Sequence, residues 1–421
     1  MRKRWVTTVM VGAMLSSLCM GCGSESSKVD KSKFETVKEE TKDGEKVSLK
    51  VWGSEADGEL VQSVIDSFVK EHKGEANFDI VFEAHEEMAS KKDGLANIEE
   101  CADVFSMPDD QLSAFAAAGV CKPIENAEQI KEANIEGAVE AATINDKLYA
   151  YPMTADNGYF LYYNKKYLSE SDVESFDSLL ETASRQNKHI SMDWASGWYL
   201  YSFFANTGLD LGLNDDGITN HCNWNTTKGK VKGVDVAQAL WNIAGNPGFQ
   251  MQDDAGFKEG AADGSVIAGV SGVWLAPDLE AAWGKNLAAT KLPTYTCAGK
   301  QIQMGSYSGY KLVGVNSYSK HSEWAAKLAE WMTNEENQLL RFQERGNVPA
   351  NKKAGSSSDV TENVANKGLI EQSEFASLQR VGGFYWEPSK NFGISMAKHD
   401  LDGNTMQKRL DLMVEGIQAI N

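Results

Sequence analysis

The stretch Val47-Ser-Leu-Lys-Val-Trp-Gly-Ser-Glu55 and the residues that follow it decide the fold class. Its first six residues alternate as in a half-buried strand, and a Gly-Ser turn then leads into a helix with one apolar face. Two further strands are expected at 78–82 and 102–106, and the second leads into a helix over 111–118. This alternation predicts a parallel sheet with crossover helices, whose ligands sit at the carboxyl ends of the strands.

A second region of the chain repeats the alternation of strands and helices. Strands are expected at 189–192, 265–270 and 310–315. Helices are expected at 198–205, 235–243, 323–333, 335–345 and 404–420. The sequence therefore predicts an α/β protein of two lobes with a helical tail.

The first residues are typical of an exported protein. Three basic residues at 2–4 precede an apolar run over 5–20, which is shorter than the roughly 20 residues of a membrane-spanning helix. The run ends at Gly21-Cys22-Gly23, which resembles a bacterial lipobox. We expect a signal peptide over 1–21, lipidation of Cys22 and a flexible polar tether over 22–46. Plain secretion, with Cys22 an ordinary residue, is the alternative.

The charge balance narrows the class of ligand. The 421 residues include 60 acidic and 41 basic side chains, for a formal net charge of −19. Such a chain repels nucleic acid and anionic lipid head groups, so we expect no nucleic-acid partner. A neutral ligand is not repelled.

Motifs for catalysis, metal binding and phosphate binding are missing from the sequence. His85-Glu-Glu-Met-Ala89 lacks the second histidine of a zinc-protease motif, and no Gly-x-Ser-x-Gly elbow occurs. We therefore expect no enzyme activity, no metal and no cofactor. Cys101 and Cys121 flank one strand–helix unit, so they are either bridged or two buried thiols. Cys222 and Cys297 carry no such argument.

Five ordered segments carry a resemblance to a known family. The most specific is Leu148-Tyr-Ala-Tyr-Pro-Met-Thr-Ala-Asp-Asn-Gly-Tyr-Phe-Leu-Tyr-Tyr-Asn-Lys166. The others are 49–55, 102–111, Gly272-Val-Trp274 and 314–319. Together they resemble the extracellular solute-binding proteins of ABC sugar importers, within the maltose/maltodextrin (maltooligosaccharide)-binding family. The resemblance implies a two-lobe fold of the periplasmic-binding-protein (Venus-flytrap) type, each lobe a mostly parallel sheet flanked by helices.

The same resemblance implies the lobe boundaries and the function. Lobe one would span 47–154 plus 308–352, and lobe two 157–304 plus 366–421. The protein would be a lipid-anchored monomer on the extracellular face of the plasma membrane of a Gram-positive-type bacterium. It would capture maltooligosaccharides between the lobes and deliver them to the membrane permease subunits of an ABC importer. The alternatives are the same transport role for another oligosaccharide, and a secreted glycoside hydrolase.

Aromatic residues at strand and helix ends are the first group of candidate sugar-binding residues. A sugar presents C–H patches on its faces, which stack on flat rings. By resemblance, Trp198, Tyr199 and Trp274 match sugar-stacking positions of the family, and Trp386 matches with a different spacing to the last helix. The alternative is that these rings are part of the core.

Polar residues of lobe one and of the crossover between lobes are the second group, since hydroxyls need acceptors and donors. Asp110 is either a sugar ligand or a first-turn helix acid. Gln111 stands where the family often has arginine, and it keeps hydrogen bonding without the charge. Asp156 and Asn157 are either ligands or hinge residues. Two weaker candidates complete the set: Glu55 and Tyr307.

Overall fold

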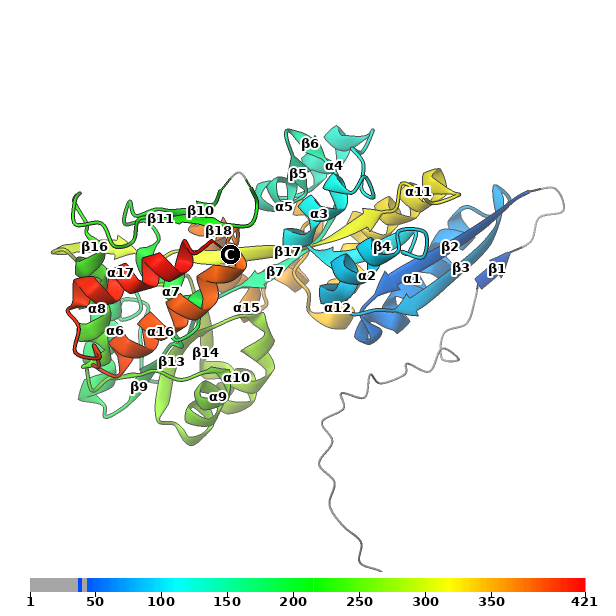
Figure 1. Ribbon diagram of the computed structural model, residues 1–421. Coiled ribbons are helices and arrows are strands. Elements are labelled where there is room, and N and C mark those ends of the chain that lie inside the picture. Colours follow the sequence, from blue (N-terminus) through cyan, green and yellow to red (C-terminus); the bar gives the residue numbers. More distant parts are fainter. Residues whose placement is uncertain (1–36, 40–43, 215, 421) are drawn as a thin grey trace, which may run out of the picture. The chain divides into compact units, whose positions relative to one another are not determined.

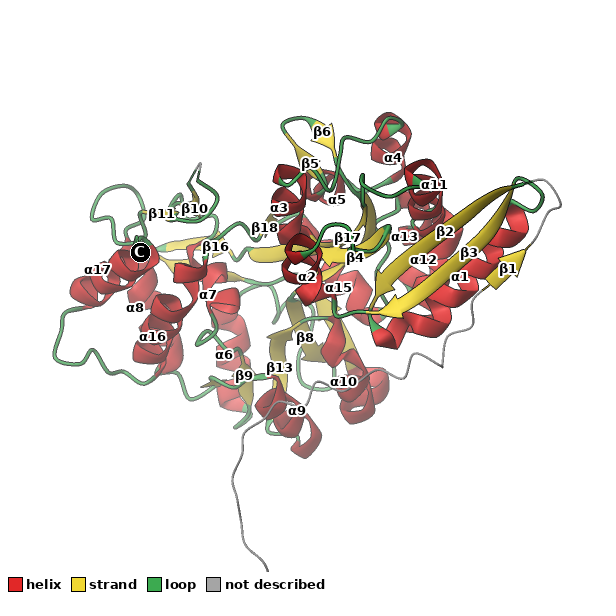
Figure 2. Ribbon diagram, turned by 45° about the vertical axis from the view of Figure 1, so that its right-hand side comes forward, coloured by secondary structure: helices red, strands yellow, loops and turns green. Residues whose placement is uncertain are grey.

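Figures 1 and 2 show the computed structural model, which describes residues 37–39, 44–214 and 216–420. The expected signal peptide and the expected lipidation site at Cys22 lie outside these residues. In the described part of the chain, no helix is both long and apolar enough to cross a bilayer.

The first sheet contains the stretch that decides the fold class. Its strands are β1 (Val37–Glu39), β2 (Glu45–Gly53), β3 (Ala76–Ala84), β4 (Val104–Pro108), β7 (Tyr151–Gly158), β17 (Ser306–Val315) and β18 (Ala376–Leu378). Their order is β1-β3-β2-β4-β17-β18, and β7 also pairs with β17. The strands expected at 47–52, 78–82 and 102–106 are confirmed. The flexible tether expected over 22–46 contains one strand, β1, which pairs with β3. Such a pair is held by backbone hydrogen bonds, so it can form in a segment with few apolar residues.

Helices from two parts of the chain accompany this sheet. They are α1 (Gly58–Glu71), α2 (Ser90–Ala96), α3 (Leu112–Ala117), α4 (Ala127–Ala133), α5 (Glu136–Ala141), α11 (Ser322–Met332), α12 (Glu335–Arg345), α13 (Lys352–Gly355) and α14 (Ser358–Thr361). In α1, Ile65 and Phe68 are fully buried, and Phe68 packs edge-on against Phe78 of β3. Burying a side chain of this size stabilises the fold by about 1.5–3 kcal/mol.

The second sheet has the order β12-β9-β13-β8-β14. Its strands are β8 (Phe160–Asn164), β9 (His189–Ser191), β12 (Phe249–Gln250), β13 (Val266–Ser271) and β14 (Leu287–Thr290). Its helices are α6 (Phe176–Arg185), α7 (Gly197–Phe204), α8 (Gly233–Ala244), α9 (Asp254–Asp263), α10 (Ala276–Trp283), α15 (Val364–Ser373), α16 (Trp386–Ala397) and α17 (Met406–Ile417). The helices expected near 198–205, 235–243 and 404–420 are confirmed.

Three two-stranded sheets complete the described strands. They are β5 (Thr143–Ile144) with β6 (Lys147–Leu148), β10 (Leu211–Leu213) with β11 (Asn220–Cys222), and β15 (Thr294–Cys297) with β16 (Lys300–Gln303).

Both large sheets are mixed, whereas mostly parallel sheets were expected. β17 runs antiparallel to β4 and β7, and β8 runs antiparallel to β13 and β14. β7 belongs to the first sheet and β8, which starts two residues later, belongs to the second. A strand that enters a sheet directly from another sheet has no crossover helix before it, so parallel pairing is not imposed. The α/β class itself is confirmed.

The buried side chains group by sheet. One core cluster runs from Val47 to Met153 and resumes from Tyr310 to Ala350, and the others gather the residues around the second sheet. Val348 is an exception, because it packs with residues of the second sheet. The lobe boundaries implied by the resemblance stay a prediction. Cys101 and Cys121 are both buried free thiols, as are Cys222 and Cys297.

Candidate functional site

The start of α7 places two aromatic side chains of the candidate site. Ser196 caps this helix by accepting a hydrogen bond from the Trp198 amide, so Trp198 and Tyr199 lie in the first turn. The Trp198 carbonyl accepts a 2.7 Å hydrogen bond from the hydroxyl of Tyr159, which lies between β7 and β8 and so ties this turn to the connection between the two sheets. Trp198 is half-buried and Tyr199 is buried. Trp198 therefore offers ring surface, whereas the Tyr199 ring packs against Tyr159 in the core.

Trp274 is the most open of the predicted aromatic residues, with 46% of its surface exposed. It follows β13 directly, after Gly272, where a Cβ atom would lie only 2.0 Å from the Trp274 ring. Its Nε1 donates a 2.7 Å hydrogen bond to one oxygen of Asp254, whose other oxygen accepts a 2.7 Å bond from Ser271. The indole is thus held over a glycine backbone, with its ring open to solvent.

Asp254, the first residue of α9, belongs to a group of three acidic residues that sequence analysis did not identify. Asp193, Asp253 and Asp254 interact electrostatically, and burial followed by the two neighbouring carboxylates raises the pKa of Asp193. The Tyr199 hydroxyl bonds to Ser271, and burial raises the pKa of this phenol well above its usual range. Ser271 therefore connects Tyr199 with Asp254, the carboxylate that holds the Trp274 ring.

Trp386 and Tyr307 complete the aromatic group from other parts of the chain. Trp386 starts α16, is half-buried, and lies 3.4 Å from the position a Cβ atom on Gly197 would take. Tyr307 is only 2% exposed, and its ring stacks at 3.9 Å on Tyr201 and lies 5.4 Å from Trp198. Tyr307 therefore supports Trp198 from within the core.

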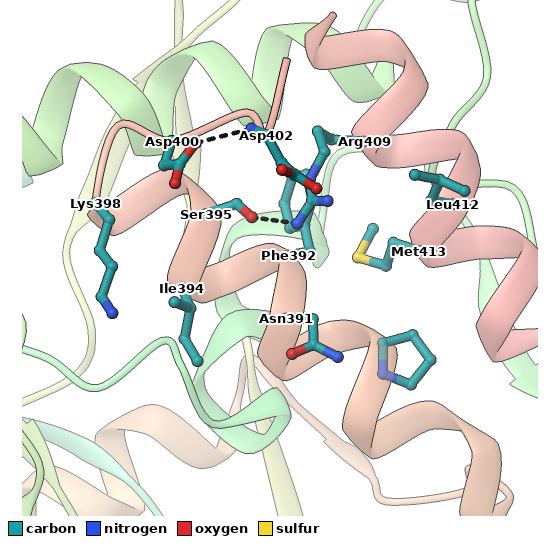
Figure 3. A pocket seen from close by; sticks show the side chains of 11 residues that line it. Asn391, Phe392, Ile394, Ser395, Lys398, Asp400, Asp402, Arg409, Leu412 and Met413 are labelled. Carbon is teal, nitrogen blue, oxygen red and sulfur yellow. Dashed lines mark hydrogen bonds between the residues drawn. The ribbon is translucent and has the colours of Figure 1, made fainter. Parts of the chain in front are cut away.

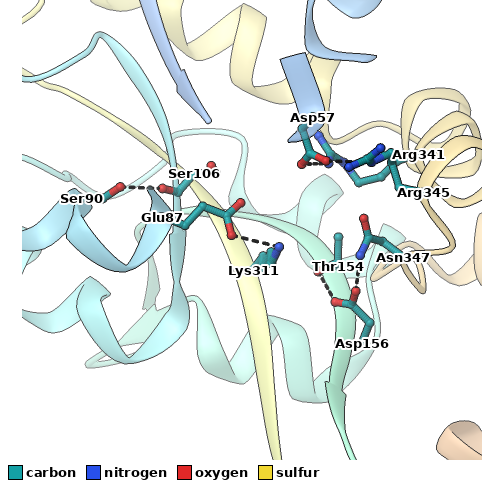
Figure 4. A network of polar contacts seen from close by, with 10 residues as sticks. All are labelled: Asp57, Glu87, Ser90, Ser106, Thr154, Asp156, Lys311, Arg341, Arg345 and Asn347. Carbon is teal, nitrogen blue, oxygen red and sulfur yellow. Dashed lines mark hydrogen bonds and ion pairs between the residues drawn. The ribbon is translucent and has the colours of Figure 1, made fainter. Parts of the chain in front are cut away.

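On lobe one, Figure 4 shows a network of charged and polar side chains. Asp57 accepts from Arg341 at 2.5 Å and from Arg345 at 3.1 Å. Glu87 pairs with Lys311 at 2.9 Å.

Asp156, one of the predicted crossover ligands, joins the same network. It accepts hydrogen bonds from Thr154, at 2.6 Å, and from the Asn347 amide. Asp156 is 8% exposed, so its carboxylate is held rigidly by these two donors.

Asn157 lies apart from this network, although it follows Asp156 in the chain. It is exposed and lines a cavity of about 650 Å³, together with Tyr310 and residues of α5 and α15. No residue of the network in Figure 4 lines that cavity. The structure therefore separates two residues that sequence analysis grouped as crossover ligands.

The remaining lobe-one candidates differ in their freedom to bind. Asp110 is exposed. Partial desolvation by the surrounding protein and, less strongly, the negative charge of neighbouring Asp109 raise the pKa of its carboxyl group. Glu55 is also exposed. The Gln111 amide, by contrast, is buried: it accepts from the Lys91 amide at 2.9 Å and donates to the Met88 carbonyl at 3.1 Å. In this structure Gln111 braces the turn before α2.

Sequence analysis missed four residues next to the candidate site. Asp254 was missed because it could be taken for an ordinary first-turn acid of α9. Arg380 was missed because its partner Asp109, 2.7 Å away, lies in a distant part of the sequence. Glu87 follows a predicted strand, so the rule that ligands sit at carboxyl ends could have found it. Lys311 is the one charged residue in the apolar run 310–315, and a charge in such a strand could have indicated a functional side chain.

A pocket lies between α16 and α17 (Figure 3). It has a volume of about 550 Å³, and Arg409 donates to Ser395 inside it. None of the predicted site residues lines it. Among the described residues, no group of three or more His, Cys, Asp or Glu side chains could hold a metal ion.

The arrangement is suited to holding a polar ring, with an open indole on one lobe and carboxylates and cations on the other. An indole face covers C–H surface, and carboxylate, amide and ammonium groups exchange hydrogen bonds with hydroxyls.

Comparisons with known proteins place the chain in a family. It matches the family described as bacterial extracellular solute-binding protein over residues 63–368. The galactooligosaccharide-binding protein of Bacillus subtilis (strain 168) is 26% identical over 348 residues, covering 78% of each chain. The maltodextrin-binding protein MdxE of the same strain is 25% identical over 293 residues, covering 64% of this chain and 67% of its own.

The solved maltodextrin binding protein MalE1 from L. casei BL23 shares the fold, with a TM-score of 0.76 at 23% identity, covering 89% of this chain and 100% of that one. The predicted two-lobe fold is thereby confirmed, and the relatives are solute-binding proteins, not enzymes. Because the family match spans more than half of the sequence, the chain belongs to the bacterial extracellular solute-binding proteins.

Proposed function

We propose that the protein captures a linear, neutral oligosaccharide of the maltooligosaccharide class and delivers it to the permease subunits of an ABC importer. The observation that carries the proposal is the half-exposed Trp274 ring, braced by Asp254 on lobe two. A flat apolar ring beside hydrogen-bonding groups suits a sugar better than an ion. The name of a pneumococcal relative, maltooligosaccharide ABC transporter solute-binding lipoprotein, supports the same role; it is 22% identical over 330 residues.

The predicted site residues take different parts in this proposal. Trp274, Trp198 and Trp386 would stack on sugar faces, and Asp110, Asp156 and Glu55 would meet hydroxyls. Four others would act from behind or beside the sugar: Tyr199 and Tyr307 beneath the rings, Gln111 in the turn before α2, and Asn157 at the crossover.

A second candidate ligand is a galactooligosaccharide. The Bacillus subtilis protein named for that ligand matches a larger share of this chain than the maltodextrin relative does, 78% against 64%. Stacking rings do not distinguish the two classes, because both present C–H faces. The glycoside hydrolase alternative is not proposed, because the relatives are solute-binding proteins.

Calorimetry on the mature chain tests the proposed ligand. The panel would contain maltose, maltotriose, longer maltooligosaccharides, a cyclodextrin, and galacto-, xylo- and cello-oligosaccharides. We expect saturable binding of maltotriose or longer chains, with no products after prolonged incubation. Binding of galactooligosaccharides alone would favour the second candidate, and binding of no sugar would contradict both.

The proposed anchor gives a prediction outside the described residues. Changing Cys22 to alanine removes the thiol that directly follows the expected cleavage site, so the protein should leave the membrane fraction and lose incorporated lipid label. Cys19→Ala is the matched control and should stay in the membrane. Retention of labelled Cys22→Ala protein in the membrane would show that the anchor lies elsewhere.

The brace of Trp274 gives a second prediction. Asp254→Ala removes the acceptor of the indole N–H and of the Ser271 hydroxyl, so the ring loses its fixed orientation. Two hydrogen bonds to a charged group support a loss of roughly tenfold in sugar affinity, smaller than the loss of the ring itself. Calorimetry should show this loss. Glu259→Ala, on the exposed side of the same helix, should bind as the wild type does.

A further inference from the structure

The pocket between α16 and α17 has the size of a small-molecule site (Figure 3). Its volume of about 550 Å³ lies within the range of about 300–1,000 Å³ that such sites occupy. Phe392 and Met413 form its floor: each is only 2% exposed and belongs to the core cluster beside the second sheet. Leu412, which is 41% exposed, adds an apolar wall. The pocket therefore combines a packed apolar floor with access from solvent.

Contacts beside the pocket hold its two helices together. Near the C-terminal end of α17, Gly416 faces Pro388 of α16 so closely that a Cβ atom would lie only 2.6 Å from the proline ring. Near the other end of the two helices, the Arg409 guanidinium of α17 donates to the Ser395 hydroxyl of α16. The pocket is therefore held between two fixed contacts.

Arg409 brings unused hydrogen-bond donors into the pocket. A guanidinium has five N–H donors, and Ser395, which is 7% exposed, accepts from Nη2. The Nε atom is buried and has no partner among the described residues. Nη1 has no partner there either, but it is not one of the buried atoms, so a ligand in the pocket can reach it. A carboxylate would satisfy this amino group with a charge-assisted hydrogen bond.

The mouth of the pocket adds charges of both signs. Lys398, Asp400 and Asp402 line it and are exposed. One oxygen of Asp400 accepts from the Asp402 amide at 2.8 Å, whereas the Asp402 carboxylate has no protein partner in the described part of the chain. An anion alone would meet the two carboxylates, and a cation alone would meet Arg409 and Lys398. A zwitterion avoids both repulsions, because its carboxylate and its ammonium group can each face the opposite charge.

We propose that this pocket binds a small zwitterion with apolar side chains, of the class of short apolar peptides and apolar amino acids. Its carboxylate accepts from Arg409 Nη1, its ammonium group donates to Asp402, and its side chains cover Met413 and Leu412. The site is independent of the proposed sugar function, because no predicted sugar-binding residue lines the pocket. One chain then carries two binding sites for ligands of different chemistry.

Calorimetry with leucyl-leucine tests the proposed ligand on the wild-type protein. We expect saturable binding at one site, with a dissociation constant below about 1 mM. Leucyl-leucinamide lacks the carboxylate, N-acetyl-leucyl-leucine lacks the ammonium group, and glycylglycine lacks the side chains. Each should bind roughly 10-fold weaker, since each loses one of the three interactions. Leucine, measured beside the dipeptide, distinguishes a single amino acid from a peptide as the preferred ligand.

Two variants connect the binding to named side chains. Arg409→Met should weaken leucyl-leucine binding by roughly 10- to 100-fold, whereas Lys408→Met, on an exposed neighbour, should bind as the wild type does. Asp402→Asn should weaken the binding of leucyl-leucine but not of its N-acetyl derivative, because only the ammonium group contacts this carboxylate. Asparagine tolerates the positive φ of 52° at this position, so the variant should fold.

Several results would overturn the proposal. They are no binding of leucyl-leucine by the wild type, equal binding of leucyl-leucine and its amide or its N-acetyl derivative, and normal dipeptide binding by Arg409→Met. If Arg409→Met melts early, Asp402→Asn decides instead, since a change at an exposed residue has little effect on folding. An Asp402→Asn protein that binds leucyl-leucine as the wild type does would then contradict the proposed site.

Discussion

Replacing Asp57 by alanine is expected to lower the free energy of unfolding by about 3–5 kcal/mol. The carboxylate pairs with Arg341 at 2.5 Å and with Arg345 at 3.1 Å. The Arg341 side chain is only 6% exposed, so the variant would leave a guanidinium charge buried without its counter-charge. The pair also ties the start of α1 to α12, and both contacts would be lost at once. Urea unfolding measures the change.

Two further variants decide whether the buried charge is the cause. Asp66→Ala, an exposed acid on the same helix α1, should stay within about 0.5 kcal/mol of the wild type. Adding Arg341→Met to Asp57→Ala should recover part of the loss, because the stranded charge is then gone. A double variant as unstable as the single one would attribute the loss to packing.

Local patterns were enough to predict the elements of the fold. The alternation over 47–52 predicted β2, because Val47, Leu49 and Val51 are buried on one side of the sheet. The helical spacing after it predicted α1, and the apolar runs near 189 and 265 predicted β9 and β13. Period and burial are linked within a few residues, so such elements can be read from the sequence.

The pairing of distant segments could not be predicted in the same way. The antiparallel contacts of β17 with β4 and β7 join parts of the chain more than 100 residues apart. Asp57 and Arg341 are separated by 284 positions, and no local pattern links one acid to one base among so many. Only the resemblance to a family supplied the discontinuous lobes.

The candidate site shows the same limit at the level of single side chains. Asp156 and Asn157 were grouped because they are neighbours in sequence, but successive strand residues point in different directions. Asp156 accordingly joins Thr154 and Asn347, whereas Asn157 lines a separate cavity. Gln111 was expected to face a sugar, yet its amide bonds to Lys91 and Met88, because a buried amide must find local partners.

The last prediction concerns Trp274, whose truncation should have the largest effect on binding. Trp274→Ala should weaken sugar affinity by roughly 30- to 1000-fold, since aromatic anchors contribute about 2–4 kcal/mol in small interfaces and each 1.4 kcal/mol is about tenfold. The ring is 46% exposed, so stability should change by about 1 kcal/mol or less. Calorimetry and thermal unfolding on the same preparation measure both quantities.

Two matched variants make the result specific to the stacking surface. Tyr318→Ala removes another exposed ring, 59% exposed on lobe one, and should leave affinity unchanged. Trp274→Phe keeps a flat ring without the N–H bond to Asp254, so it should retain part of the binding that alanine loses. A Trp274→Ala protein that melts early but binds normally when cold would place the ring in the core. Because Gly272 has no room for a Cβ atom beneath this ring, the geometry favours the opposite result: normal melting with the binding lost.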